Sequence, residues 1–406
     1  MKIKPFAALR PPKSLVEEVE CRAYDVLNSE EARLESAGNP KSMYHINKPE
    51  INLEPGALDT DPRVYTAALE QFEKFKSEGW LLREEKEVYY LYAQTMNDRT
   101  QYGFVVCCHA SDYKDGRIKK HELTRKDKED DRTRHVMTLR SHTGPAFFTY
   151  RDVAEISELI AAEMAAAPLF DFVSCDGIQH TLWRIDEVQS KKLAALFEAK
   201  VPVFYIADGH HRSAAAARTQ AECAPANPNH TGNEDYNYFL AVAFPDSQLA
   251  IMPYNRAVKT LNGLDEAGFL AALEKEFTIT ECSDGVVAAN GEFKFYMNGV
   301  WRHAMPKFDI SKFDVIGQLD ASWLQEKVLD PILGIDDPRT STGIDFIGGI
   351  RGTAELEKLV NSGKYTIAFS MPAVTVDQLM AIADAGKIMP PKSTWFEPKL
   401  RDGLVS

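Results

Sequence analysis

Hydrophobic and polar positions alternate along the chain with two periods, which predict strands and helices in turn. Two β-rich runs, Glu87–Thr95 and Gln101–Ala110, are separated by the turn-forming MNDRT and predict a β-hairpin. Further along, the apolar runs PAFFTY, HTLWRID and VPVFYI alternate with helical patterns over Val153–Ala166 and Glu187–Ala199. An alanine-rich helical segment follows the last run. This alternation predicts an α/β protein with a mixed sheet.

Local signals mark where other helices begin and end. The segment Asn28–Glu31 resembles a capping box. A helix over Pro62–Ser77 has proline in its first turn and Gly79 just beyond its end. Another helix is capped by Thr375 and ended by Gly386. The tail that follows, KIMPPKSTWFEPKLRDGL, is too rich in proline for regular structure and too rich in apolar residues for disorder.

The length of 406 residues exceeds what one growing hydrophobic core usually serves, so two or three subdomains are expected. The segment Cys223–Asn237 is rich in Pro, Asn and Gly, and is either a long surface loop or a boundary. We therefore expect an N-terminal lobe over 1–225, with its core at about 101–225. A C-terminal α/β lobe over 226–406 would follow, and its tail would return to the candidate ligand site identified below.

Composition narrows the classes of function. A net charge of −13 argues against a nucleic-acid or membrane partner, because both need a basic surface. The six cysteines show no CxxC pair and no metal-ligand spacing, which is typical of thiols in a reducing compartment. No signal peptide and no apolar run of membrane-spanning length occurs, so a cytoplasmic protein is expected. No pattern indicates zinc, haem or flavin. The number of subunits stays open, with a homodimer among the options.

The strongest chemical signal is Asp208-Gly209-His210-His211-Arg212, which lies between the VPVFYI strand and the alanine-rich helix. A helix N-terminus leaves backbone N–H groups unpaired and carries partial positive charge, which favours anions and phosphate above all. Arg212 adds a guanidinium suited to phosphate or carboxylate. The alternative is a structural turn in which Asp208 caps the helix and the histidines satisfy carbonyls. We expect a ligand site at the carboxyl edge of the sheet.

Two further segments are candidates for the same site. In KKHELT, Glu122 beside His121 could act as a general base or ligate magnesium if it faces the Asp208 turn. The alternative is the solvated face of a charged helix. In the tail, Lys392, Ser393 and Thr394 offer phosphate contacts, although the glycines of a P-loop are absent.

Metal and dinucleotide sites are weaker alternatives. Zinc is disfavoured because adjacent histidines such as His210 and His211 seldom point at one metal, and no nearby cysteine completes the set. The glycine-rich stretch over 345–352 lacks the GxGxxG spacing of a dinucleotide site. Asp208 is the candidate ligand for Mg²⁺.

Six segments in order along the chain resemble one known family. They are PFAALRPP, AYDVL, KKHELT, IADGHHRSAAA, MPYNRAV and MPPKSTWFEPKLRDGL. Together they are similar to the conserved family catalogued as domain of unknown function 1015, over essentially the whole chain.

Three of these segments also resemble the free L-serine kinases of the ParB/sulfiredoxin-like superfamily. The counterparts are His121-Glu122, the turn Asp208–Arg212, and Pro391–Thr394. The resemblance implies a ParB/sulfiredoxin-like core that carries the DGHHR strand, turn and helix. It implies Glu122 as general base, with His121 and the turn around substrate and phosphoryl group. Lys392, Ser393 and Thr394 would lie near the nucleotide phosphates. A sulfiredoxin would need a cysteine in the turn, and this chain has none.

Two functions are therefore expected as alternatives. The first is a kinase that phosphorylates the hydroxyl of free L-serine or a related compound, using ATP or ADP with Mg²⁺. In this case Asp208 and Glu122 would be the catalytic residues. The second is a ParB-like regulatory module that binds nucleotide without transferring phosphoryl to a metabolite. A kinase needs Glu122 within about one small-molecule length of the Asp208 turn, whereas a regulatory module does not.

Overall fold

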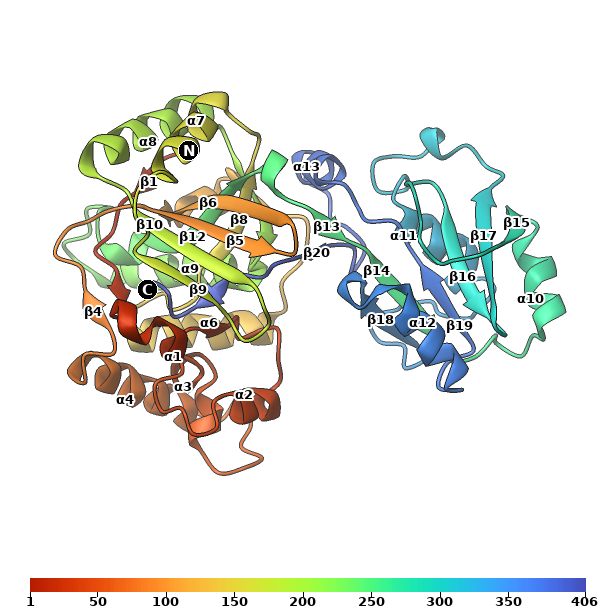
Figure 1. The fold of residues 1–406 in the computed structure, drawn as a ribbon, viewed down its shortest axis with the longest axis horizontal. Helices are drawn as coiled ribbons and strands as arrows, with labels where there is room; N and C mark the ends of the chain where they lie inside the picture. The colour runs from red at the N-terminus through yellow and green to blue at the C-terminus, as the bar shows by residue number, and fades with distance from the viewer. The chain divides into compact units, whose positions relative to one another are not determined.

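The computed structural model describes residues 1–406, which divide into two compact units (Figure 1). The first unit contains Met1–Leu249 and Pro398–Ser406, and the second contains Ala250–Glu397. The predicted boundary after residue 225 differs from this division. Strand β12 (Tyr238–Pro245) pairs with both β6 (Arg99–His109) and β8 (Ala146–Tyr150), which holds it inside the first unit. The segment over 223–237 is therefore a loop within that unit.

A nine-stranded mixed sheet forms the centre of the first unit. Its strand order is β7-β11-β8-β12-β6-β5-β10-β9, and β1 pairs with β6. Its other strands are β1 (Ile3–Lys4), β5 (Tyr90–Met96), β7 (Ile118–Lys119), β9 (Phe170–Val173), β10 (Gln179–Arg184) and β11 (Phe204–Asp208). The predicted hairpin is confirmed, because β5 and β6 pair in antiparallel register. The mixed α/β class is also confirmed, since β11 and β12 each have one parallel and one antiparallel neighbour.

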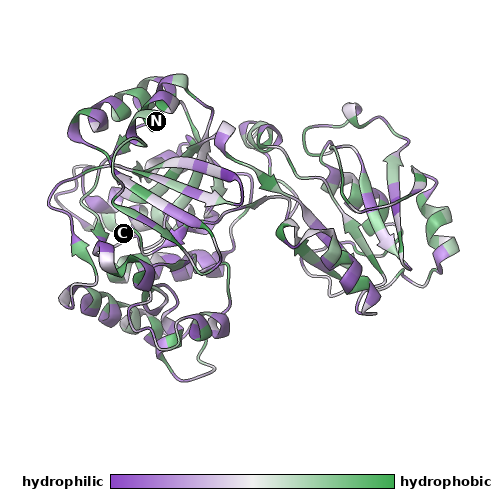
Figure 2. Cartoon of the chain, viewed as in Figure 1, coloured by the Kyte–Doolittle hydropathy of each residue, from purple (hydrophilic) through white to green (hydrophobic).

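The helices of the first unit lie on both sides of this sheet. They are α1 (Val16–Val19), α2 (Ser29–Glu35), α3 (Tyr44–Asn47), α4 (Arg63–Ser77), α5 (Ser111–Lys114), α6 (Lys126–Leu139), α7 (Ala154–Glu163), α8 (Glu187–Lys200) and α9 (His210–Ala226). Figure 1 shows α7 and α8 on one side, and α1 to α4 with α6 on the other. Phe197 of α8 packs its ring against Phe104 and Tyr150 of the sheet. These helices carry both hydrophilic and hydrophobic residues (Figure 2), as expected for elements with one buried face.

The second unit is built on an antiparallel sheet of six strands, in the order β15-β17-β16-β19-β14-β18. Its strands are β14 (Tyr254–Val258), β15 (Phe277–Cys282), β16 (Phe293–Met297), β17 (Val300–Pro306), β18 (Ile344–Gly348) and β19 (Ile367–Ser370). Its helices are α10 (Glu266–Leu273), α11 (Asp320–Leu324), α12 (Gly352–Asn361) and α13 (Val376–Asp384). Adjacent residues of β19 belong to two separate apolar clusters. Phe369 lies in one cluster with Trp323, and Ala368 lies in the other with Leu356. Both faces of this sheet are therefore covered.

Three two-stranded ribbons complete the strands. They are β2 (Leu9–Arg10) with β4 (Leu82–Arg83), β3 (Cys21–Arg22) with β21 (Arg401–Asp402), and β13 (Ile251–Met252) with β20 (Trp395–Phe396). The predicted caps are confirmed, because Asn28 and Thr375 each form a full capping box. No helix combines the length and the apolar character needed to span a lipid bilayer.

The last residues of the chain are anchored in the first unit. Arg401 is buried, donates to Ser174 Oγ at 2.9 Å, and pairs with Asp176 and Glu20. Asp402 is fully buried, and its Oδ2 accepts a hydrogen bond of 2.6 Å from Asn47. Its Oδ1 has no hydrogen-bond partner. Burial raises the pKa of Asp402 to about 7, although Arg212 opposes this effect.

This raised pKa predicts how Asp402 contributes to stability. The unfolded carboxyl has an ordinary pKa near 4, so its contribution is present below that value and is lost as pH rises through about 7. Between about pH 5 and pH 8, wild-type protein should lose about 2–3 kcal/mol relative to Asp402→Asn. Urea denaturation of both proteins measures the difference in stability. The pH-dependent contributions of the histidines are the same in both proteins and cancel in this difference. A difference independent of pH would contradict the raised pKa.

Candidate functional site

Two of the predicted segments meet because β7 and β11 are parallel neighbours. Phe204 and Tyr205 of β11 lie opposite Ile118 and Lys119 of β7. Parallel strands end at the same edge of a sheet, so the residues after each strand lie close together. His121 and Glu122 follow β7, and the turn at Asp208 ends β11. The edge formed by these residues is called the β7–β11 edge below.

The turn at Gly209 places the first residues of α9 at this edge. Gly209 has a φ of 87°, in the left-handed region that favours glycine. A Cβ at this position would lie 3.2 Å from the Cα of Ala146 and 3.0 Å from Nε of Arg212. The helix begins at His210, so its first backbone N–H groups have no acceptor within the helix. The predicted helix N-terminus is therefore present beside Asp208.

Substituting Gly209 by alanine should destabilise the first unit for two reasons. The left-handed conformation costs a side chain about 1–2 kcal/mol, and overpacking against Ala146 adds about 1–3 kcal/mol. Gly116→Ala is the matched control, because Gly116 also has a positive φ, 72°, but a Cβ added there would have no atom within 4 Å. Urea denaturation should show the larger loss for Gly209→Ala. Equal losses would show that the close contact has no energetic consequence.

Two buried imidazoles and one carboxylate form a cluster at the β7–β11 edge. The rings of His121 and His210 lie 4.6 Å apart between centroids, edge to face. One ligand atom from each of His121, Glu122 and His210 lies within 4.8 Å of the other two. Both histidines are buried, whereas Glu122 is exposed. The carboxylate is therefore open to an incoming molecule at a point backed by the two rings.

Burial keeps these histidines neutral near pH 7. Burial lowers the pKa of His121 to about 4, against the opposing effect of Asp208. Burial and the neighbouring His121 also hold the pKa of His210 well below its ordinary value. The Nε2 atom of His210 is buried without a hydrogen-bond partner. A neutral imidazole can donate one hydrogen bond and accept another, so this pair offers polar contacts without adding charge.

Asp208 lies between two cations. Its Oδ1 is 3.1 Å from Nζ of Lys399, and its Oδ2 is 2.8 Å from Nη2 of Arg212. Burial alone would raise the pKa of Asp208, but Lys399 and Arg212 outweigh it and hold the pKa well below its ordinary value. Asp208 is therefore ionised and serves here to position the two cations.

Arg212 is engaged by protein groups on several sides. It donates to the carbonyl of Pro145 at 2.5 Å and to Asp25 at 3.1 Å, in addition to Asp208. Burial opposes its charge, while Asp25 and Asp208 raise its pKa above the ordinary value. These bonds connect α9 to Pro145, Asp25 and Asp208. The predicted contact of Arg212 with phosphate stays a prediction.

His211 has a different contact from His210. Its Nε2 accepts a hydrogen bond of 3.1 Å from the backbone N–H of Arg125. Burial lowers the pKa of His211, with Asp25 opposing. This bond joins the helix start to the loop between Glu122 and α6. The role of His211 in substrate binding stays a prediction.

The donor atoms at the β7–β11 edge do not fit magnesium well. Mg²⁺ prefers oxygen ligands, whereas His121, Glu122 and His210 supply two nitrogens and one carboxylate. Both oxygens of Asp208 already pair with cations, so its contacts lend no support to its predicted role as a magnesium ligand. That role stays a prediction, as does the participation of Mg²⁺.

The predicted nucleotide-binding residues belong to the second unit. Lys392 is exposed, has a φ of 56°, and places Nζ 5.8 Å from the ring centroid of Tyr254. Ser393 is buried, and its hydroxyl donates to the carbonyl of Pro390 at 2.7 Å. The meeting of Lys392, Ser393 and Thr394 with the β7–β11 edge stays a prediction.

Sequence reasoning missed Lys399 and Asp25 as partners in the charge network of the site. Lys399 lies in the same proline-rich tail as Lys392. The sequence identified this tail as part of the candidate site, but nothing in it indicated that Lys399 contacts Asp208. Asp25 lies in the short segment AYDVL, and nothing in its local pattern indicates a contact with Arg212.

The comparisons with known proteins give one family and several distant structures. The family described as "Protein of unknown function (DUF1015)" matches residues 3–322. No curated protein matches. The solved structures that show a distant similarity include a free serine kinase in complex with AMP, a conserved hypothetical protein from Pyrococcus furiosus, and C-terminally truncated SbnI from Staphylococcus aureus.

These structures are far from the present chain in sequence. Identities are 14%, 15% and 9% in the same order, with TM-scores of 0.36, 0.36 and 0.38. The matches cover 72%, 74% and 73% of this chain, and 86%, 94% and 85% of the others. The family match spans most of the chain, and the family predicted from the six segments is confirmed. The chain belongs to the family described as "Protein of unknown function (DUF1015)".

Proposed function

We propose that this protein is a small-molecule kinase that transfers a phosphoryl group from ATP or ADP to a hydroxyl group. The acceptor would be free L-serine or a related hydroxy compound, and Glu122 would accept its proton. One observation carries the proposal: the exposed Glu122 carboxylate lies within 4.8 Å of a ring nitrogen of His210, the first residue of α9. A general base must reach the proton that it abstracts, so it has to lie beside the groups that hold its substrate.

The chemistry would depend on position and charge more than on covalent catalysis. Phosphoryl transfer asks the protein to align donor and acceptor and to stabilise negative charge as it develops. The N-terminus of α9 offers backbone N–H groups and partial positive charge for a phosphoryl group. Lys399, held 3.1 Å from Asp208, supplies a further cation at the same turn. Neutral His121 and His210 would donate hydrogen bonds to substrate oxygens. They would not compete with Glu122 for the proton of the acceptor hydroxyl.

The resemblance to free L-serine kinases supports the same function. The matching segments His121-Glu122 and Asp208–Arg212 come from distant parts of the sequence, and they lie together at the β7–β11 edge. A regulatory module that only binds nucleotide gives no reason for a carboxylate at this point. In the proposed function, Lys392, Ser393 and Thr394 would contact nucleotide phosphates, with Mg²⁺ as the accompanying cation.

A nucleotide-conversion assay tests the proposal. The full-length protein is incubated with ATP or ADP, Mg²⁺ and one member of a panel of free amino acids and polyols, and nucleotides are separated by chromatography. A kinase should convert ATP to ADP, or ADP to AMP, faster with one hydroxyl compound than without it. Nucleotide binding by calorimetry, with no conversion for any acceptor, would favour the regulatory module and contradict the kinase.

A further inference from the structure

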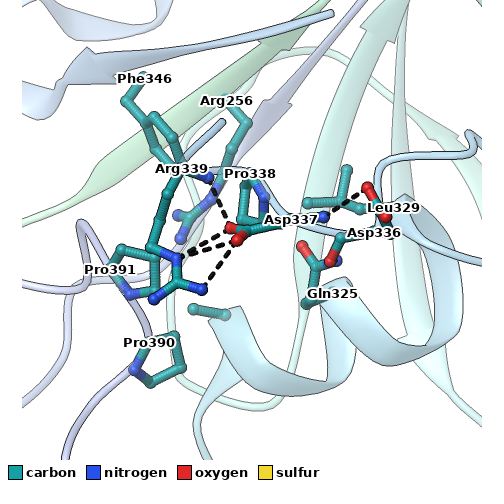
Figure 3. Close-up of a pocket in the computed structure, with 11 residues that line it drawn as sticks. Arg256, Gln325, Leu329, Asp336, Asp337, Pro338, Arg339, Phe346, Pro390 and Pro391 are labelled. Carbon is teal, nitrogen blue, oxygen red and sulfur yellow. Dashed lines mark hydrogen bonds and ion pairs between the residues drawn. The ribbon is translucent and has the colours of Figure 1, made fainter. Parts of the chain in front are cut away.

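A pocket of about 300 Å³ opens in the second unit beside the middle of β14 (Figure 3). Phe346 and several prolines give it apolar walls. Its polar groups come from Arg256 on β14, from Gln325 at the start of the π-helix Gln325–Leu329, and from the loop that carries Asp337 and Arg339. A few polar groups in an apolar concavity are typical of small-molecule sites, and this volume lies at the small end of their range.

Arg256 is a buried cation with no carboxylate partner. Only 4% of its surface is exposed, and it forms no ion pair. Its Nη1 donates to the backbone carbonyl of Tyr254, and its guanidinium lies 5.5 Å from the ring centroid of Phe346. Figure 3 shows the side chain extending from β14 toward the loop that carries Pro338. Burial lowers its pKa to about 10, opposed by Tyr254 and Asp320. Buried charges in proteins are usually paired, so this guanidinium lacks an expected anion.

The carboxylates around Arg256 serve other partners. Asp337 holds the guanidinium of Arg339 with contacts of 2.9 Å to Nε and 2.7 Å to Nη2. Asp320 accepts a hydrogen bond of 2.6 Å from the backbone N–H of Gly291 and another of 3.1 Å from Asn290. Neither Asp337 nor Asp320 therefore forms an ion pair with Arg256.

Gln325 provides a second group that lacks a partner. Its Nε2 donates to the carbonyls of Ile335 and Asp336, at 2.7 Å and 3.3 Å, which fixes the amide. Its Oε1 is buried without a hydrogen-bond partner. An unpaired buried acceptor destabilises the fold, and a donor on a bound molecule would remove that penalty.

We propose that this pocket binds a small organic anion. Its carboxylate or phosphate group pairs with Arg256, and its hydroxyl or ammonium group donates to Oε1 of Gln325. A guanidinium recognises both kinds of oxyanion by charge-assisted hydrogen bonds. Every residue used belongs to the second unit, so the site stands independently of phosphoryl transfer at the β7–β11 edge.

Thermal unfolding of the full-length protein in the presence of simple anions tests this site. The probes are inorganic phosphate, glycerol phosphate, acetate and lactate, with sodium chloride at the same ionic strength as the reference. A bound ligand raises the unfolding temperature in a saturable way. At least one probe should do so, and lactate should bind more tightly than acetate because it adds a hydroxyl donor. No effect beyond that of sodium chloride for any probe would overturn the proposal.

Variants assign the effect to the pocket. Arg256→Gln should weaken binding by about tenfold or more, because a charge-assisted bond is lost. Arg302→Gln, which breaks a pair with Glu266 in the same unit, should bind the probes like wild type. If Arg256→Gln does not fold, Gln325→Leu decides the question: loss of the preference for lactate over acetate supports the site, and an unchanged preference overturns it. Equal binding by Arg256→Gln and wild type would also overturn it.

Discussion

Glu122→Gln is expected to lower kcat for phosphoryl transfer by roughly 10²- to 10⁴-fold, the usual cost of removing a general base. The amide keeps the size of the side chain but cannot accept the proton of the acceptor hydroxyl. Glu122 is exposed, so the substitution should leave the fold intact. Nucleotide affinity should stay close to that of wild type, because the base acts on the acceptor. Steady-state kinetics and calorimetry measure the two effects separately.

Glu158→Gln provides the matched control for this experiment. Glu158 is an exposed residue of α7, and the same chemical change there should leave kcat unaltered. Wild-type turnover in Glu122→Gln would reject the assignment of Glu122 as general base. Loss of nucleotide binding together with turnover would instead assign Glu122 to binding, and would equally contradict its proposed role.

Arg212→Met is expected to destabilise the first unit by about 2–4 kcal/mol, because it removes a buried guanidinium and its charge-assisted hydrogen bonds to two partly exposed carboxylates. The substitution removes the cation that Asp208 and Asp25 share, and the bond to the carbonyl of Pro145. Only Lys399 would then neutralise Asp208. Urea denaturation gives the overall loss, and faster hydrogen exchange at the backbone amides of α9 would locate it.

Arg218→Met is the matched control on the same helix. Arg218 pairs with Asp130 and Glu222, but its side chain is about one-third exposed. Exposed ion pairs contribute little, so this variant should lose less than about 1 kcal/mol. Equal losses of stability in the two variants would show that the contacts of Arg212 do not stabilise the start of α9 more than the exposed ion pairs of Arg218 do.

Regular periodicity made much of the fold predictable. The hairpin of β5 and β6, the caps at Asn28 and Thr375, and helices α4, α7 and α8 all agree with their local patterns. Short elements held by distant partners were not predictable in the same way. Strand β7 contains only Ile118 and Lys119, too few residues for any period, and its pairing with β11 depends on tertiary structure.

The candidate site shows the same division. The turn Asp208–Arg212 was visible because polar residues interrupt a buried strand just before a helix, and its geometry follows from Gly209. The position of Glu122 depends on the pairing of β7. The sequence therefore left two alternatives for Glu122, a place at the site or a place on the solvated face of a charged helix. The second unit begins at Ala250 rather than near residue 226, because pairing of β12 with β6 and β8 overrides a loop-like composition. The composition identified the loop over 223–237, but only the strand pairing showed that this loop belongs to the first unit.

Phosphorus NMR tests most directly whether the β7–β11 edge transfers phosphoryl groups. Wild-type protein and Glu122→Gln are incubated in parallel with ATP or ADP, Mg²⁺ and the acceptor panel, and the spectra are followed with time. We expect a new phosphate monoester resonance with L-serine or a related hydroxy compound in the wild type. The same signal should grow far more slowly in Glu122→Gln. Spectra that contain only nucleotide and inorganic phosphate for every acceptor would contradict the proposed kinase.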